Sequence, residues 1–285
     1  MKPVPFDYYR PDTLEETLPL LAEFGEDALI LSGGLSLGAM LNMRVARPQI
    51  VIDINRIGGL AGIEREDKWI KIGAMVRQEK LARSVDCWEV VPLLVKGLKN
   101  VGHYQTRSRG TVGGSIAHAD PSAEMPLCLL TIGGEVELSS VHGVRQVPAK
   151  EFFLGALETS CREDEMVTAI YCSLQAVGTG TAFEEICERK GDFAIVSAAA
   201  WARREGEKLN IGLGLGGVED KPVAIEVKNL RSSCEFLPSE IDDFVHSLNP
   251  LQDRRASEQY RRQLAIYLSQ KVIKSAVGRC HSEAY

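Results

Sequence analysis

The stretch "RGTVGGSIAHADPSAEMP", residues 109–126, combines three glycines with a dense set of hydrogen-bonding side chains. Thr111 and Ser115 flank the pair Gly113–Gly114, and His118 follows three residues later. A glycine has no side chain, so its backbone can approach another group closely. The stretch therefore predicts either a polar surface loop or a backbone segment that lies against a ligand.

The polar side chains of this stretch divide into donors and acceptors. Thr111, Ser115 and His118 can donate hydrogen bonds, whereas ionised Asp120 and Glu124 can only accept them. This order suits a ligand with phosphates at one point and sugar-like hydroxyls nearby. Alternatively, the stretch is a glycine-rich turn followed by a helix. "DPSAE" is typical of a helix start, so we expect Asp120 to act as an N-cap and Glu124 to reach a ligand.

A second glycine-rich segment, "LSGGLSLG", spans residues 31–38 between a predicted strand and a predicted helix. Gly33 and Gly34 can take positive φ, Ser32 and Ser36 can add hydroxyl donors, and the helix offers its positive end. The segment lacks both the G-K-[ST] of a P-loop and the G-x-G-x-x-G dinucleotide pattern. Alone it predicts a tight turn; together with residues 109–126 it predicts one elongated ligand between two lobes.

Length and composition are those of an ordinary globular protein. The chain has 285 residues, 45% hydrophobic and 25% charged, and its formal net charge is −6. Two or three lobes are expected at this length. The negative charge argues against general nucleic-acid or anionic-membrane binding. No run approaches the roughly 18 apolar residues of a membrane helix, and the N-terminal residues show no signal core, so we expect a cytoplasmic protein without membrane insertion.

Seven cysteines are scattered singly along the sequence, with no C-x-x-C pair. An odd number without a secretion signal favours reduced thiols over a disulfide framework. Iron–sulfur clusters and zinc sites need grouped thiolates, so we expect neither within this chain. The five histidines show no H-E-x-x-H spacing, and no catalytic metal is expected.

The pattern of apolar residues predicts an α+β fold in three domains. Residues 1–55 read as helix, strand, glycine turn, helix and strand, which predicts an α/β lobe. Residues 56–176 contain strand-like runs around a helix at 84–102 and predict a second, α+β lobe. Residues 177–285 carry a strand pair followed by two helices and predict a C-terminal α+β domain.

The first helix is predicted from a capping-box pattern at Thr13 and Glu16 and a helix stop at Gly25. Pro19 lies inside this pattern, so we expect the helix to be kinked or interrupted there.

Both glycine-rich segments also resemble a known family. "SGGLS" at 32–36 followed by "GTVGGSIAHADPSAEMP" at 110–126 resembles the FAD-binding medium subunit of molybdenum hydroxylases, which include xanthine dehydrogenases, carbon monoxide dehydrogenase and bacterial hydroxylases of aldehydes and N-heterocycles. Supporting matches, "FDYYRPDTLEETLPLLAE", "IKIGAM", "DEMVTAI" and "KGDFAIVSAAA", extend the resemblance over nearly the whole chain. It implies an FAD-binding fold of two α/β lobes, followed by a domain of strands and then helices.

The resemblance implies particular cofactor contacts. Residues 32–36 and 111–115 would surround the FAD pyrophosphate mainly with backbone N–H groups, His118 would lie near the phosphates, and Glu124 near the ribityl hydroxyls. Val167 and Phe193 match positions near the flavin ring, although core packing explains either residue equally well. The expected FAD contacts are Leu31, Ser32, Gly33, Gly34, Leu35, Ser36, Leu37, Val101, Thr111, Gly113, Gly114, Ser115, His118, Asp120, Glu124, Val167, Lys190 and Phe193.

The resemblance also implies a reaction and partners. The substrate is hydroxylated at a molybdenum cofactor in a large subunit, and electrons pass through the [2Fe–2S] clusters of a small subunit to the FAD of this chain. The expected assembly is a heterotrimer or a dimer of heterotrimers. The protein holds the flavin and tunes its chemistry, and no residue of this chain is expected to act as acid or base on the substrate.

Two other functions stay open on the sequence alone. A self-sufficient flavoenzyme with the same binding fold would need acid or base groups facing the flavin, and the sequence offers no convincing set. A non-catalytic nucleotide-binding module would need only the glycine-rich segments. Flavin content, and activity without partner subunits, distinguish the three functions. The sequence names neither the organic substrate nor the electron acceptor.

Overall fold

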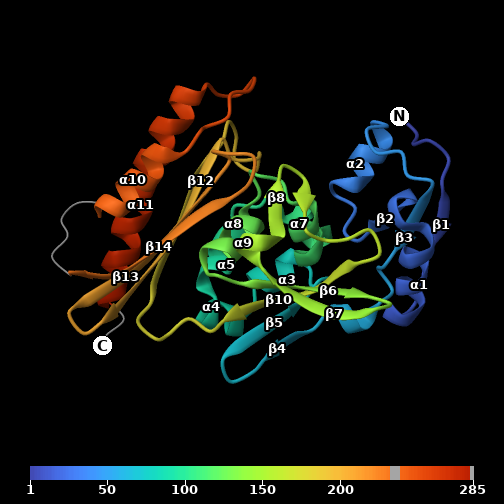
Figure 1. Ribbon diagram of the computed structural model, residues 1–285, viewed down its shortest axis with the longest axis horizontal. Helices are drawn as coiled ribbons and strands as arrows, with labels where there is room; N and C mark the ends of the chain where they lie inside the picture. The colour runs from blue at the N-terminus through green and yellow to red at the C-terminus, as the bar shows by residue number, and fades with distance from the viewer. Residues whose placement is uncertain (232–237, 283–285) are drawn as a thin grey trace.

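The computed structural model describes residues 1–231 and 238–282. Three large cores follow one another along the chain, in the N-terminal, middle and C-terminal parts. Figure 1 shows the blue N-terminal part at one end of the molecule, the green middle part in the centre and the orange C-terminal part at the other end. The expected α+β architecture is confirmed.

The N-terminal part is built on a three-stranded parallel sheet with the strand order β1-β3-β2. Its elements are β1 (Asp7–Tyr9), α1 (Leu14–Phe24), the 3-10 turn η1 (Gly25–Asp27), β2 (Ala28–Leu31), α2 (Leu37–Asn42) and β3 (Ile50–Asp53). The expected start of α1 is confirmed, since Thr13 Oγ1 accepts a hydrogen bond from the Glu16 N–H at 3.2 Å.

Pro19 does not interrupt α1, so the expected interruption is wrong. The helix runs continuously from Leu14 to Phe24 with Pro19 inside it. A proline removes one helical hydrogen bond, but Pro19 lies on the exposed side, where water can reach the carbonyl that loses its partner. The buried side, with Thr17 and Leu21, keeps its packing.

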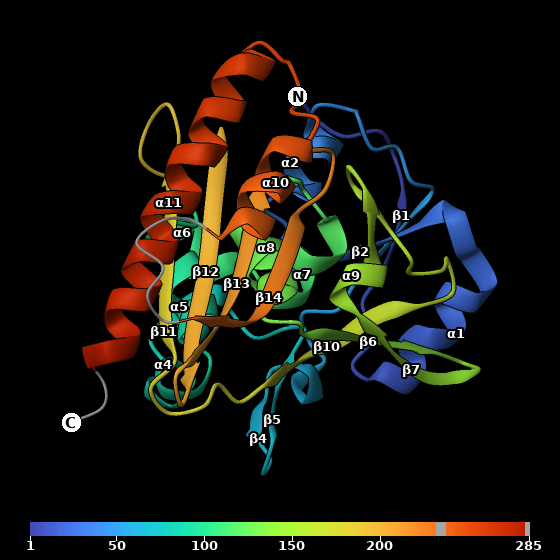
Figure 2. The same cartoon turned by 60° about the vertical axis from the view of Figure 1, so that its left-hand side comes forward.

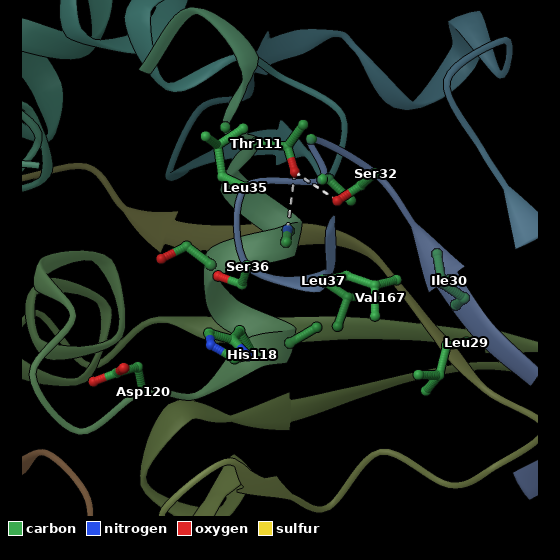
Figure 3. Close-up of a pocket in the computed structure, with 18 of the residues that line it drawn as sticks. Leu29, Ile30, Ser32, Leu35, Ser36, Leu37, Thr111, His118, Asp120 and Val167 are labelled. Carbon is green, nitrogen blue, oxygen red and sulfur yellow. Dashed lines mark hydrogen bonds between the residues drawn. The ribbon is translucent and has the colours of Figure 1, made fainter. Parts of the chain in front are cut away.

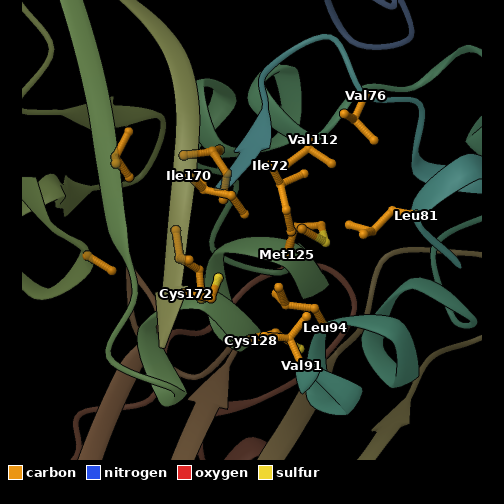
Figure 4. Close-up of a cluster of buried hydrophobic side chains, with 14 of the residues drawn as sticks. Ile72, Val76, Leu81, Val91, Leu94, Val112, Met125, Cys128, Ile170 and Cys172 are labelled. Atoms are coloured by element: carbon orange, nitrogen blue, oxygen red, sulfur yellow. The ribbon is translucent and has the colours of Figure 1, made fainter. Parts of the chain in front are cut away.

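The middle part is a five-stranded antiparallel sheet, ordered β4-β5-β10-β6-β7, covered by helices. Its core includes Ile72, Leu94, Met125 and Ile170, all fully buried (Figure 4). Its elements are η2 (Gly58–Leu60), β4 (Ile63–Arg65), β5 (Trp69–Gly73), α3 (Gln78–Ala82), α4 (Val85–Val90), α5 (Pro92–Leu98), α6 (Tyr104–Arg109), α7 (Val112–His118), α8 (Glu124–Thr131), β6 (Glu135–Ser140), β7 (Gly143–Pro148), α9 (Ala149–Phe152), β8 (Phe153–Gly155), β9 (Glu158–Thr159) and β10 (Met166–Ser173).

The single helix expected at 84–102 is two helices, α4 and α5. Pro92 begins α5, and Val91 before it has φ −139° and ψ 53°. A residue that precedes proline is pushed out of the helical region, so the chain turns between the two helices.

The C-terminal part is a four-stranded antiparallel sheet, β11-β12-β13-β14, with α11 packed along β11 and β12 (Figure 2). The opposite face packs against α8 and α5. The expected strand pair is confirmed, with Glu205 opposite Lys208 at its turn. Its elements are β11 (Gly180–Ile186), β12 (Val196–Glu205), β13 (Lys208–Gly216), β14 (Val223–Arg231), α10 (Ser239–Ser247) and α11 (Glu258–Ser282). Among the described helices, none has the length and apolar character needed to cross a membrane.

We predict that Gly180→Ala destabilises the protein by about 1–3 kcal/mol, because the added methyl group overpacks the interface between β11 and α11. A Cβ at Gly180 would lie 2.0 Å from the Ala276 carbonyl oxygen. The control is Gly278→Ala, where a Cβ meets nothing within 4 Å and a helical alanine should stabilise by up to about 1 kcal/mol. Urea unfolding measures both; equal stability of the two variants would show that this contact is misplaced.

Candidate cofactor site

The turn between β2 and α2 is shaped by two glycines that serve different purposes. Gly34 has φ +76°, a left-handed conformation that glycine adopts without strain. Gly33 does not have positive φ, contrary to expectation; it is needed because its backbone lies against residues 109–110. A Cβ at Gly33 would be 2.5 Å from the Arg109 carbonyl oxygen. The turn therefore packs directly onto the second glycine-rich segment.

The centre of that second segment is a helix, α7, and the expected loop is wrong here. Thr111 is the N-cap, and its Oγ1 accepts a hydrogen bond from the Gly114 N–H at 3.1 Å. Gly113 lies in the first turn, where a Cβ would be 2.4 Å from Ala74 Cβ. The glycine pair thus allows α7 to pack closely against residues 74–76.

Asp120 is not the N-cap of the next helix, so that expectation is also wrong. Helix α7 ends at Ala119, which is left-handed with φ +50°, and α8 begins only at Glu124 with Ala123 as its N-cap. Asp120 Oδ1 instead accepts a hydrogen bond from the Ser122 N–H at 2.8 Å. Its carboxylate stabilises the turn between the two helices.

The two glycine-rich segments make direct side-chain contact. Thr111 Oγ1 donates a hydrogen bond to Ser32 Oγ at 3.1 Å (Figure 3). A Cβ at Gly114 would lie 2.7 Å from the same Ser32 oxygen. The first turn of α7 and the turn after β2 therefore form one continuous wall.

A polar network behind this wall fixes its position. Asn55 Nδ2 donates to the Ser32 carbonyl at 2.7 Å and to Asp53 Oδ1 at 2.6 Å, and Arg77 Nη2 donates to Asn55 Oδ1 at 2.8 Å. Arg77 also donates through Nη1 to the Arg109 carbonyl. Although burial opposes it, hydrogen bonds from Tyr8 and Asn55 lower the pKa of Asp53 and keep it ionised. The network links the two segments through Asn55, which follows β3, and Arg77, the N-cap of α3.

A cavity of about 860 Å³ lies against this wall. Its volume is within the usual range for small-molecule and cofactor sites. Every expected contact residue lines it except Leu31, at the end of β2, and Lys190, which is exposed beside the lining residues Gly191–Phe193. The structure therefore brings residues from all three parts of the chain to one cavity.

Four successive N–H groups, from Gly33 to Ser36, make no hydrogen bond within the described part of the chain. Gly33 is itself buried. Unpaired buried N–H groups are rare in proteins, and consecutive ones form a concave site for an anion. The N–H groups of Val112 and Gly113 in α7 are already bonded, to the Val76 and Ala74 carbonyls at 2.9 and 2.8 Å. The free backbone donors therefore come from the β2–α2 turn.

Side chains extend this polar wall. Figure 3 shows Ser36 and His118 on the same side of the cavity, with Asp120 beyond them. Neither Ser36, Ser115 nor His118 has a hydrogen-bond partner for its side chain among the described residues. These donors are available to phosphate oxygens or hydroxyl groups of a ligand.

The opposite side of the cavity is apolar. Figure 3 shows Leu29, Ile30, Leu37 and Val167 gathered there. Val167 is only 6% exposed and belongs both to the cavity wall and to the middle core. Phe193 is 55% exposed, which excludes core packing as the reason for an aromatic residue there. The cavity thus offers a polar wall for phosphates and hydroxyls and an apolar surface for a ring system.

Glu124 lies in the cavity wall at the start of α8, with 7% of its surface exposed. Burial raises its pKa to about 8, and the charges of Glu185 and Asp120 add to the effect. A buried carboxyl group seeks hydrogen-bond partners, and ligand hydroxyl groups would supply them.

Several lining residues were not anticipated from the sequence. They come from the segment after β5, from α3 and from the segment that leads into β10, where the motifs "IKIGAM" and "DEMVTAI" pointed to the region but not to single residues: Ala74, Met75, Gln78, Arg162, Glu163, Glu165 and Met166. Asn55 and Arg77 in the supporting network were also missed. Isolated polar residues have no periodic signal, so only the tertiary structure shows their role.

The walls of the cavity are chemically suited to FAD. The cavity has a donor-rich wall and an apolar wall, and its unpaired N–H groups suit a pyrophosphate. Within residues 1–231 and 238–282, no group of three or more His, Cys, Asp or Glu side chains is arranged to hold a metal ion.

Comparison with known proteins also indicates an FAD-binding site. A family model described as "FAD binding domain in molybdopterin dehydrogenase" matches residues 4–172, and one described as "CO dehydrogenase flavoprotein C-terminal domain" matches residues 181–276. The chain belongs to the FAD-binding medium subunits of the molybdenum hydroxylase family. It is an oxidoreductase subunit that carries this family's FAD-binding domain.

Individual relatives cover almost the full length. The 6-hydroxypseudooxynicotine dehydrogenase complex subunit alpha of Paenarthrobacter nicotinovorans is 35% identical, over 98% of this chain and 97% of the relative. The carbon monoxide dehydrogenase medium chain of Hydrogenophaga pseudoflava is 33% identical, over 98% and 100%. A solved structure of carbon monoxide dehydrogenase from the same organism superposes with a TM-score of 0.90 at 32% identity, covering 98% of this chain and 100% of the other.

We predict that the cofactor-free chain loses stability as the pH rises from about 5 to about 8. The folded-state pKa of Glu124 is raised from 4.5 to about 8, so the folded protein holds a proton that the unfolded chain releases. The free energy of unfolding then falls by at most about 1.4 kcal/mol per pH unit for this group and levels off above its folded pKa. Glu124→Gln should flatten this fall in urea unfolding; an unchanged pH profile would contradict the assignment.

Proposed function

We propose that this chain is the flavin subunit of a heterotrimeric molybdenum hydroxylase. It accepts electrons from the [2Fe–2S] clusters of a small partner subunit and passes them to an external acceptor. A large subunit carries the molybdenum cofactor where the substrate reacts. The observation that carries this proposal is the cavity with four unpaired N–H groups opposite an apolar wall, in a chain whose relatives are named as medium chains or complex subunits.

We assign roles within the cavity from the geometry of its walls. The N–H groups of Gly33–Ser36 bind the pyrophosphate, with Ser36, Ser115 and His118 as further donors. Glu124 accepts hydrogen bonds from the ribityl hydroxyls. FAD, when bound, takes up and releases the electrons; the chain's own residues bind it, orient it and limit its contact with water. Val167 and Phe193 lie against the ring, and Leu31, Val101 and Lys190 remain predicted contacts.

We also propose the domain division 1–55, 56–176 and 177–285, which is supported by the three larger sheets. The six cysteines in the described residues are all free, which agrees with a reducing, cytoplasmic location. The proposed assembly is a heterotrimer or a dimer of heterotrimers.

The proposal is tested by purifying the complex from its native host and identifying its chains, metals and flavin. We expect one FAD on this chain and, alongside it, a cysteine-rich small chain and a molybdenum-containing large chain. Substrate should reduce the FAD in the complex but not in the isolated chain, because the substrate reacts elsewhere. Substrate oxidation by the isolated chain would favour a self-sufficient flavoenzyme, and a chain that takes up no FAD would overturn the proposal.

We predict that Gly33→Ala raises the Kd for FAD at least about tenfold, equivalent to about 1.4 kcal/mol. The added Cβ would lie 2.5 Å from the Arg109 carbonyl and would displace the turn that carries the unpaired N–H groups. Gly38→Ala is the matched control, since a Cβ there, in α2, meets nothing within 4 Å. Titration of the cofactor-free chains with FAD measures both; equal affinities would show that the contact between the segments does not shape the site.

A further inference from the structure

Two carboxyl groups, one buried and one half-buried, lie where the middle part meets the C-terminal sheet. Glu124 begins α8 and lines the cofactor cavity. Glu185 lies in β11 outside that cavity, and its Oε2 atom is buried without a hydrogen-bond partner in the described chain. A buried carboxylate that lacks a partner is costly. Because this cost is retained, the position of the Glu185 carboxyl group points to a function.

The register of the C-terminal sheet shows which way Glu185 faces. Glu185 pairs directly with Ser197 in β12. Trp201, four residues along the same face of β12, donates from Nε1 to the Thr131 carbonyl of α8 at 2.9 Å. Because side chains alternate between the two faces of a sheet, Glu185 and Ser197 face α8, the helix that begins with Glu124.

The polar and charged groups near this pair include a hydroxyl group, two thiols, a further carboxylate and one lysine. Ser197 Oγ is fully buried and also lacks a hydrogen-bond partner within the described residues. The charge of Asp120 acts on Glu124, and the thiols of Cys128 and Cys187 lie within the influence of both glutamates. The neighbouring lysine of α5, Lys96, donates to the carbonyl and hydroxyl of Thr181, at the start of β11.

Among the described residues neither glutamate forms a salt bridge, and burial favours the protonated form of both. Burial raises the pKa of Glu185 to about 7 and that of Glu124 to about 8. Between these values one carboxyl group is protonated and the other is ionised. Negative charge added to a ligand in the neighbouring cavity raises the pKa of both groups further.

We propose that Glu124 and Glu185 form a proton-accepting pair that takes up one solvent proton when FAD in the adjacent cavity is reduced. This rests on the proposed function. Two electrons from the external reductant and one proton convert FAD to the anionic reduced flavin. A second solvent proton forms an O–H bond on the ionised carboxylate of the pair, and no other group is oxidised or reduced. The pair thereby neutralises charge that would oppose the arrival of electrons.

The test is potentiometric titration of the full chain loaded with FAD, from about pH 7 to about pH 8, where Glu124 holds its proton and Glu185 is ionised. Each proton taken up with two electrons contributes about 30 mV per pH unit to the midpoint potential. We expect about 60 mV per pH unit in the wild type and about 30 in Glu185→Gln. Glu184→Gln is the matched control, because Glu184 faces the other side of β11 and pairs with Lys271 at 3.1 Å; it should keep the wild-type slope.

A second measurement needs no variant. Chemical reduction of the wild-type, FAD-loaded chain in weak buffer with a pH indicator should consume two solvent protons for each FAD in the same pH range. One proton for each FAD, or a wild-type slope retained in Glu185→Gln, would overturn the pair while leaving the proposed function intact. A chain that holds no FAD would overturn both.

Discussion

The cofactor cavity depends on the contact between Gly33 and the backbone of Arg109. A Cβ at residue 33 would lie only 2.5 Å from the Arg109 carbonyl, so no other residue type fits without moving one of the two segments. This approach places Ser32 against Thr111 at 3.1 Å and closes the wall between the turn after β2 and helix α7. The residues that carry the four unpaired N–H groups line the cavity because the turn is held there. Arg77 and Asn55 hold it from behind.

The glycines of the two glycine-rich segments have a role different from the one that their sequence pattern indicates. Gly33, Gly113 and Gly114 are short of space mainly because of neighbouring protein atoms, from Arg109, Ala74, and Ser32 with Thr111. They bring two lobes close enough to share one ligand. Among the glycines of these two segments, Gly34 alone has positive φ, so it alone is required by its own backbone conformation. The motif therefore works by packing the cavity walls together, and the backbone donors come from one segment rather than two.

Local signals in the sequence predicted the structure well where the interaction is local. The capping pair Thr13 and Glu16 and the hairpin at Glu205 and Lys208 involve neighbours in the chain, so their residues specify them. Asp120 shows the limit. Its helix-start pattern is intact, yet the left-handed end of α7 at Ala119 places it in a turn, four residues before α8 begins. Glu185 was not anticipated because a strand whose two faces are both covered shows no alternation of polar and apolar residues.

In the proposed function, the N–H groups of Gly33–Ser36 hold the FAD phosphates. Amide hydrogen exchange of the full chain, with and without FAD, tests this contact. We predict that FAD strongly protects the amides of residues 33–36 from exchange. Those of Val112 and Gly113, already bonded to the Val76 and Ala74 carbonyls, should change little. FAD binding without protection of residues 33–36 would contradict the account.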